Sequence, residues 1–249
     1  MEYSAFTDAG LVRPGNEDSY CLTRLDGPSS ILAAVADGMG GHEGGEIASR
    51  IAVTAMESVV TGWWRNPPGD DKDVLSIVSR GASTANRMIK EESVRRFGVP
   101  CMGTTLTAAV ICGNHAYLGH AGDSRAYLIT RDGISQITED HSLVGEMVRD
   151  GDLTEAEAMC HPGRNILTNA LGTSENPRLD MHVKQLSEGD IVLLCTDGLT
   201  NLVNKEEILR SARATGSLDE LVRSLVGLAN SRGGHDNTTV VAVRYPDGR

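Results

Sequence analysis

Acidic residues recur in this sequence where buried strands are predicted to end. Asp37 directly follows the apolar run ILAAVA, and Asp197 directly follows IVLLCT. Asp123 comes after YLGHAG, and Asp236 lies just before TTVVAV. Any one of these aspartates is equally well explained as an ordinary turn residue. Repeated at several strand ends, however, such carboxylates can meet around a divalent cation, which offsets their mutual repulsion.

Neighbouring residues strengthen this interpretation. Gly38 and Gly198 directly follow the first two of these aspartates. We expect each glycine to permit a tight backbone turn and to leave its carbonyl oxygen accessible as a cation ligand. Glu17 and Asp18 lie in the segment RPGNEDSY, before another short run. Acids from five separate segments could therefore build one oxygen-rich site.

The overall charge suits a cation better than a polyanion. The chain has 249 residues and a formal net charge of -11. Long-range repulsion makes nucleic acid and anionic membranes poor partners for such a chain. Where several carboxylates share one pocket, the local sign of the charge favours bound metal.

Neither secretion nor membrane insertion is indicated. The five cysteines form an odd, scattered set without a CxxC pair, which argues against a disulfide framework or a zinc knuckle. The first residues, MEYSAFTDAG, lack the basic and apolar segments of a signal peptide. No run approaches the roughly 18 apolar residues of a membrane span. We expect a soluble cytoplasmic protein.

The predicted strands can position these acids. Short apolar or β-branched runs bounded by Gly, Asp or Asn are typical of strands. Between residues 114 and 137 they follow one another too closely for helical crossovers, so these strands are predicted to pair antiparallel. The predicted strands cover residues 31–36, 105–112, 116–121, 126–130, 191–195 and 238–243.

Amphipathic helices are predicted in an early and a late block. Apolar residues with helical spacing cover residues 45–60 and 73–92, and a third helix starts at Ser217 and runs to the glycines at 233 and 234. Strands lie before, between and after these blocks, which predicts helices flanking antiparallel sheets in an α+β sandwich. The length suits a single domain over residues 1–249.

The segment 140–172 does not follow the strand pattern. It is polar and contains glycines, and Thr154 and Glu157 have the spacing of a helix capping box. Such an insertion is either a functional flap or a surface excursion with a local fold, and its composition fits both.

Seven motifs occur in one order along nearly the whole chain. Each alone is a modest signal, whereas all seven in this order are highly specific. The chain thereby resembles the PP2C-like, or PPM, metal-dependent serine/threonine protein phosphatases in their compact bacterial form. The motifs are RPGNEDSY (13–20), ADGMGGH (36–42), MGTT (102–105), GHAGDSRAYL (119–128), TEDHS (138–142), CTDGLTN (195–201) and GHDNTTVV (234–241).

The resemblance implies a four-layer αββα sandwich, in which helices flank two central antiparallel β-sheets. It also makes residues 140–172 a flap subdomain that borders the active site, where it is expected to help select protein substrates. The implied partners are phosphorylated proteins and a cognate serine/threonine kinase. Nucleic acid and membrane are not expected partners, and the chain is expected to be a monomer.

The resemblance further implies a centre of two Mn2+ or Mg2+ ions. Asp37 matches the carboxylate that bridges the ions, and Gly38 matches a carbonyl ligand. Asp197 and Asp236 complete the ligands of one ion. Glu17 matches the acidic residue at the other ion, where it acts partly through water. Hard oxygen ligands serve Mn2+ and Mg2+ alike, so the sequence leaves the metal open.

Three more positions match residues around these ligands. Asp123 resembles the ligand of a third, weaker metal found in bacterial members, and that ion shares Asp197. Asp18 and Asn237 match residues that support the ligands. Other residues beside the motifs are assigned structural roles: Thr104, Thr105, His120, His141 and His235.

The implied reaction is the hydrolysis of phosphoserine and phosphothreonine. Two closely spaced cations lower the pKa of a bridging water, and the resulting hydroxide attacks phosphorus in line. No covalent phosphoenzyme is needed. Arg13 matches the family's phosphate-binding guanidinium, whose planar fork can hold two phosphate oxygens.

One departure from the family concerns the proton donor. Many eukaryotic relatives have a histidine directly after the Asp-Gly pair, where it is proposed to protonate the leaving alkoxide. That position is Met39 here. His42 is a candidate substitute, its alternative being an ordinary loop histidine, and a metal-bound water could also supply the proton.

Three other functions are alternatives to protein dephosphorylation. A non-catalytic phosphoprotein sensor on the same fold would be expected to lack some metal carboxylates, and none of the matched ones is missing. A phosphoester hydrolase of small metabolites stays open, because such a site recognises the phosphoryl group itself. A two-carboxylate glycosidase needs only one acid pair and leaves the DGMGG, GDSR and HDN segments unexplained.

Overall fold

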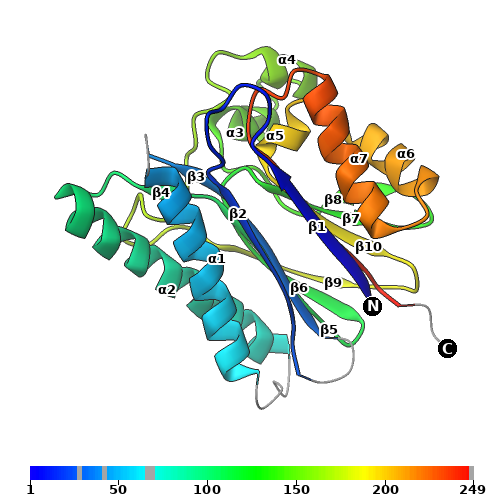
Figure 1. Cartoon of the computed structure of the whole chain (residues 1–249), viewed down its shortest axis with the longest axis horizontal. Helices are drawn as coiled ribbons and strands as arrows, with labels where there is room; N and C mark the ends of the chain where they lie inside the picture. Colours follow the sequence, from blue (N-terminus) through cyan, green and yellow to red (C-terminus); the bar gives the residue numbers. More distant parts are fainter. Residues whose placement is uncertain (27–29, 41–43, 65–70, 247–249) are drawn as a thin grey trace.

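Two antiparallel sheets face each other in the centre of the molecule (Figure 1). The computed structural model describes residues 1–26, 30–40, 44–64 and 71–246. The first sheet contains, in spatial order, β1 (Glu2–Asp8), β11 (Thr238–Arg244), β10 (Ile191–Cys195), β7 (Arg125–Ile129) and β8 (Ile134–Gln136). The second contains β2 (Asp18–Arg24), β3 (Ile31–Met39), β5 (Leu106–Cys112), β6 (His115–Ala121) and β9 (Asp180–Gln185), with β4 (Gly103–Thr104) paired to the end of β3.

Helices cover the outer face of each sheet. Figure 1 shows α1 and α2 on the outer face of the second sheet and α6 and α7 beside the first, with α3, α4 and α5 at one end of the sandwich. The α+β sandwich expected from the sequence is therefore confirmed. The helices are α1 (Gly44–Trp63), α2 (Asp71–Phe97), α3 (Leu143–Asp150), α4 (Glu155–Cys160), α5 (Asp197–Thr200), α6 (Lys205–Ala214) and α7 (Leu218–Ser231).

Three layers of buried apolar side chains lie between the four layers of helices and sheets. Alternate residues of one strand serve two of them: Leu32 and Ala34 of β3 pack toward the α1 and α2 side, while Ala33 and Val35 pack between the sheets. The remaining layer joins the first sheet to α7. Burial of both strand faces explains why the central strands are uninterrupted apolar runs.

The predicted strands and helices are all present, and the structure adds elements that the sequence pattern did not reveal. The strand β9 carries exposed residues over half its length, so its DMHVKQ sequence lacks an apolar run. The helix α6 has one buried residue, Ile208, although Asn204 and Glu207 form a capping box that signals its start. Weakly buried elements give weak sequence patterns.

The segment 140–172 contains α3 and α4 and is tied to the sandwich near both ends. The predicted capping box of Thr154 and Glu157 is present at the start of α4. Near its start the His141 N–H donates to the Gly122 carbonyl (2.7 Å), and near its end an isolated bridge joins Leu171 to Thr104. A second bridge, between Ser142 and Leu167, closes the segment on itself. Among the described residues, no helix is both long and apolar enough to cross a membrane.

Candidate active site

The acids meet where the two sheets end. Asp37 continues the face of β3 that looks toward the other sheet, because side chains alternate along a strand. Asp18 lies directly opposite Asp37 in the ladder between β2 and β3. Cross-strand partners project to the same face, so both carboxylates enter the space between the sheets.

Asp18 bridges the two sheets. One of its carboxylate oxygens, Oδ2, accepts hydrogen bonds from the hydroxyls of Thr196 (2.8 Å) and Thr239 (2.7 Å), which belong to the opposite sheet layer. The other oxygen, Oδ1, is buried without a partner among the described residues. Burial raises the pKa of Asp18 to about 7, although the two hydroxyls lower it. The two hydroxyl hydrogen bonds therefore do not offset the cost of ionising this buried carboxylate.

Asp37 is held through its backbone. Its N–H donates to the Thr105 hydroxyl (2.9 Å), and its carbonyl accepts from the Thr104 hydroxyl (2.8 Å). The expected structural role of these two threonines is confirmed by this geometry. Burial raises the pKa of Asp37 well above its usual value, and the neighbouring carboxylates, first that of Asp18, raise it further.

Asp197 opens the single-turn helix α5 rather than an irregular turn. Its Oδ2 accepts a hydrogen bond from the Asn201 side chain (3.1 Å), one helical turn later. Its Oδ1 is buried without a partner among the described residues. Burial and then the carboxylate of Asp236 raise the pKa of Asp197.

The expectation that Gly38 and Gly198 provide tight turns was wrong. Neither glycine has a positive φ, so neither adopts a conformation reserved for glycine. Space is the reason instead, because a Cβ at Gly38 would collide with the Gly45 carbonyl, and one at Gly198 would collide with the Asn237 carbonyl. Close backbone approach thus brings segments of the site together.

Asp236 faces an arginine from the N-terminal loop. Arg13 donates from a terminal nitrogen to Asp236 Oδ2 (2.7 Å), and the arginine side chain remains 49% exposed. The Asp236 hydrogen bond raises the pKa of Arg13. A guanidinium that is both anchored at the acidic cluster and open to solvent can receive an anion.

Asn237 fastens this N-terminal loop to the start of β11. Its amide donates to the carbonyls of Ala9 (2.9 Å) and Gly15 (2.8 Å), and its Oδ1 accepts from the Glu17 N–H (2.8 Å). These three bonds span the loop that carries Arg13. Asn237 therefore supports the loop and the backbone of Glu17.

Glu17 borders the cluster at the start of α1. Its carboxylate lies so close to Gly45 that a Cβ there would be 2.8 Å from the carboxyl carbon. Burial raises the pKa of Glu17, Arg13 lowers it, and Asp236 raises it again. The half-buried Glu17 therefore interacts electrostatically with Arg13 and Asp236.

Asp123 lies in the turn between β6 and β7. Burial raises its pKa well above the usual value, and the carboxylates of Asp197 and Asp140 raise it further, while Arg125 lowers it. A cavity of about 280 Å3 borders both Asp123 and Asp197 and extends along α3, α4 and the start of α6. The segment 140–172 therefore forms one wall of a hollow beside the acids.

The donor set fits a hard divalent cation. Carboxylates from separate segments raise one another's pKa, and the buried oxygens Asp18 Oδ1 and Asp197 Oδ1 have no partner among the described residues. Oxygen-rich, negatively charged sites of this kind suit Mg2+ and Mn2+. In the described part of the chain no three His, Cys, Asp or Glu side chains form a ready-made cage. The fit therefore rests on donor chemistry and charge.

His42, the candidate proton donor, lies outside the described residues. Met39 is the last residue of β3, and its side chain lies against Gly103, where a Cβ would be 2.7 Å from the Met39 terminal methyl carbon. A thioether has no proton to donate, so Met39 acts in packing.

Sequence reasoning missed several side chains that serve the site. Asn201 could have been found, because it stands four residues after Asp197 in CTDGLTN, the spacing of one helical turn. Thr196 and Thr239 could not, since their role depends on how the opposite sheet packs against Asp18.

Residues 14–229 match the family described as protein phosphatase 2C. The serine/threonine phosphatase stp of Listeria innocua is 37% identical over 242 residues, which cover 95% of this chain and 93% of that protein.

Solved structures agree with the sequence comparison. The serine/threonine phosphatase of S. agalactiae superimposes with a TM-score of 0.89 at 36% identity, covering 99% of each chain. The catalytic domain of the serine/threonine protein phosphatase PstP, in complex with 2 manganese ions, gives a TM-score of 0.84 at 35% identity, covering 99% of this chain and 98% of that one. The chain belongs to the protein phosphatase 2C family of serine/threonine protein phosphatases.

Proposed function

We propose that this phosphatase hydrolyses phosphoserine and phosphothreonine on proteins with the help of bound divalent cations, and so reverses the action of a serine/threonine kinase. One observation carries the proposal. Carboxylates from separate segments crowd together at the end of the sandwich beside a partly exposed arginine, and neighbouring carboxylates raise the pKa of Asp18, Asp37, Asp123 and Asp197. These residues are Asp18, Asp37, Asp123, Asp197, Asp236 and Arg13.

Two ions, Mn2+ or Mg2+, would be held by the carboxylates of Asp37, Asp197, Asp236 and Glu17 and by the Gly38 carbonyl. The related PstP catalytic domain in complex with 2 manganese ions supports this proposal. When bound, such a pair of cations lowers the pKa of a shared water, which makes hydroxide available near neutral pH for attack on phosphorus. We assign Asp123, together with Asp197, to a third and weaker ion.

The protein's own groups orient the substrate. Arg13 would hold two oxygens of the phosphoryl group with its planar guanidinium and neutralise charge that develops as the bond to the leaving oxygen breaks. Asn237 keeps the Arg13 loop in place through the three hydrogen bonds described above. For the proton required by the leaving alkoxide we retain His42, because Met39 can supply none.

Removing a ligand should abolish metal-dependent turnover. Phosphate release from phosphothreonine and phosphoserine peptides should require Mn2+ or Mg2+. It should fall by more than about 100-fold in Asp37→Asn and in Asp236→Asn, since loss of a mere supporting group already costs about 10- to 100-fold. Asp132→Asn, at an exposed turn between β7 and β8, is the control. Turnover without added metal, or full activity in both Asp37→Asn and Asp236→Asn, would contradict the proposal.

Metal-free protein should lose stability as the pH rises from 6.5 to 8. A raised aspartate pKa means that the folded state binds its proton more tightly than the unfolded chain does, and this contribution is lost as the pH rises through the folded-state pKa. For Asp18 that pKa is about 7, which corresponds to about 1 kcal/mol over this range. Burial lowers the pKa of His120 to about 4 and also lowers that of His182, so both histidines oppose this trend, but because an unfolded histidine titrates near about 6.5 their contribution fades above about pH 7.

Thermal unfolding at the two pH values checks this expectation. Tm should be lower at pH 8 without metal, and Mn2+ should raise Tm more at pH 8, where the carboxylates are ionised. Asp18→Asn should weaken the pH dependence, whereas Asp132→Asn should retain it. A Tm that is the same at both pH values in metal-free protein contradicts the electrostatic account.

Arg13 should contribute through phosphate binding. Arg13→Ala should lower kcat/KM for phosphopeptides by about 10- to 100-fold, which corresponds to about 1.5–3 kcal/mol for hydrogen bonds to charged groups. Arg13→Lys should recover only part of this loss, because a lysine cannot form the two parallel bonds of a guanidinium. Steady-state kinetics at saturating Mn2+ provides the measurement. Unchanged kcat and KM in Arg13→Ala would refute the role.

A further inference from the structure

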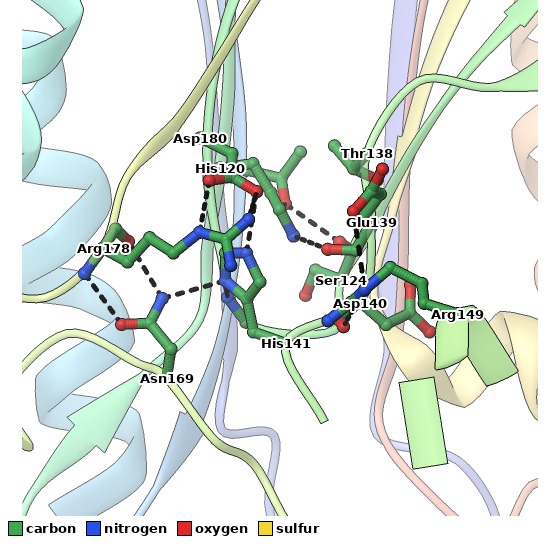
Figure 2. A network of polar contacts seen from close by, with 12 residues as sticks. His120, Ser124, Thr138, Glu139, Asp140, His141, Arg149, Asn169, Arg178 and Asp180 are labelled. Carbon is green, nitrogen blue, oxygen red and sulfur yellow. Dashed lines mark hydrogen bonds and ion pairs between the residues drawn. The ribbon is translucent and has the colours of Figure 1, made fainter. Parts of the chain in front are cut away.

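The TEDHS segment, residues 138–142, has no part in the chemistry proposed above, yet it is fastened along the turn that carries Asp123. The Thr138 hydroxyl accepts from the Ala126 N–H (3.0 Å). The Glu139 carbonyl lies 3.0 Å from His120 Nε2. Asp140 receives three hydrogen bonds from the Arg125 guanidinium. The segment thus contacts residues on both sides of the turn (Figure 2).

His141 makes the most direct contact with this turn. It is 1% exposed. Its backbone N–H donates to the Gly122 carbonyl (2.7 Å), and the Gly122 N–H in return donates to its imidazole Nδ1 (3.2 Å). Asp123 is the next residue along the chain. One histidine therefore binds both backbone polar groups of the residue before Asp123.

The neighbours of His141 fix which ring nitrogen carries the proton. The Asn169 side chain accepts from the Arg178 N–H (2.9 Å) and donates to the Arg178 carbonyl (2.9 Å), which fixes the orientation of its amide. The same amide nitrogen lies 2.8 Å from His141 Nδ1. Two N–H groups, from Asn169 and Gly122, thus point at Nδ1, which must be an unprotonated acceptor.

The opposite ring nitrogen faces a carboxylate. His141 Nε2 lies 3.0 Å from Asp180 Oδ2, and Arg178 donates to both oxygens of Asp180 (2.7 and 2.8 Å), as Figure 2 shows. Although burial alone would raise it, the hydrogen bonds from Arg178 and His141 lower the pKa of Asp180 to about 2. An ionised carboxylate only accepts, so Nε2 carries the proton. The imidazole is neutral and held in one tautomer.

The turn itself depends on this support. Gly122 has φ +114°, a conformation that side-chain-bearing residues rarely adopt. A Cβ at this position would also collide with the Thr105 side chain. Because the turn packs tightly and Gly122 is buried, its N–H cannot turn to water if its acceptor is lost.

We propose that His141 is a positioning residue for Asp123, which it holds in place by accepting the Gly122 N–H in a tautomer fixed by Asp180 and Asn169. This inference rests on the proposed role of Asp123 as ligand of the third ion. His141 itself belongs to the flap segment, 140–172, and the Thr168 N–H near the other end of that segment donates to its carbonyl (2.9 Å), so His141 connects both ends of the flap segment to the Asp123 turn.

Two substitutions separate the functions of the two ring nitrogens. The amide oxygen of His141→Asn can stand where Nδ1 stands and accept the Gly122 N–H, while the Asp180 contact is lost. The amide of His141→Gln can reach Asp180 from the place of Nε2 but leaves the Gly122 N–H without an acceptor. A merely structural histidine would not distinguish these variants in this direction.

Manganese titration is the first test. Calorimetry should show weaker binding at the weak Mn2+ site by about 10-fold in His141→Gln, and Asp123→Asn should remove that site. His141→Asn should bind Mn2+ more like the wild type. The Mn2+ concentration for half-maximal activity should rise in His141→Gln, with kcat recovering at excess Mn2+. Equal Mn2+ affinity in both His141 variants contradicts the positioning role.

Hydrogen exchange separates this inference from the proposed function. In the Mg2+-loaded protein, NMR should show a Gly122 amide that exchanges slowly in the wild type and His141→Asn and faster in His141→Gln. If Asp123→Asn titrates with Mn2+ like the wild type, the assignment of Asp123 fails, and amide exchange alone then decides whether His141 holds the turn. Equal exchange in all three proteins would overturn that claim.

A measurement on the wild type avoids any variant that fails to fold. The imidazole 15N shifts of Mg2+-loaded protein should identify His141 as the neutral tautomer with its proton on Nε2. A proton on Nδ1 would overturn the inference, because Nδ1 could then not accept the Gly122 N–H.

Discussion

Repulsion among carboxylates at the end of the sandwich is the constraint on which the rest of the site depends. Asp18, Asp37 and Asp197 lie in a partly buried space, where burial raises the pKa of all three and neighbouring carboxylates raise each pKa further. A protein gains nothing in stability from such crowding. The arrangement makes physical sense as a cation site, since a bound divalent ion turns the same charges from mutually repulsive into attractive partners.

Close packing of the backbone around the two sheets brings these carboxylates together. Glycines at positions 38 and 198 let backbones approach where a side chain would collide. Asp18 is tied to the opposite sheet by two threonine hydroxyls, and Asn237 fastens the Arg13 loop to β11. Asp18 and the Arg13 loop are thus fixed by groups that do not themselves take part in the chemistry, as precise metal sites require.

The sequence predicted those features that depend on local pattern. The burial of β3 and β10 on both faces follows from their apolar runs, and the acids could be located because they end those runs at Asp37 and Asp197. The expectation of tight turns at Gly38 and Gly198 was wrong, because the sequence pattern does not show which backbone packs against each glycine, here the carbonyls of Gly45 and Asn237. His141 was assigned only a structural role, since its ring partners, Asp180 and Asn169, are 39 and 28 residues away.

A crystal structure of the protein with Mn2+, with the ions located by their anomalous scattering, tests the central claim most directly. The account predicts two strong peaks between the sheet ends, coordinated by Asp37, the Gly38 carbonyl, Asp197 and Asp236, with a weaker peak beside Asp123. Absence of manganese from this cluster, or manganese bound only at other carboxylates of this acidic surface, would contradict the account.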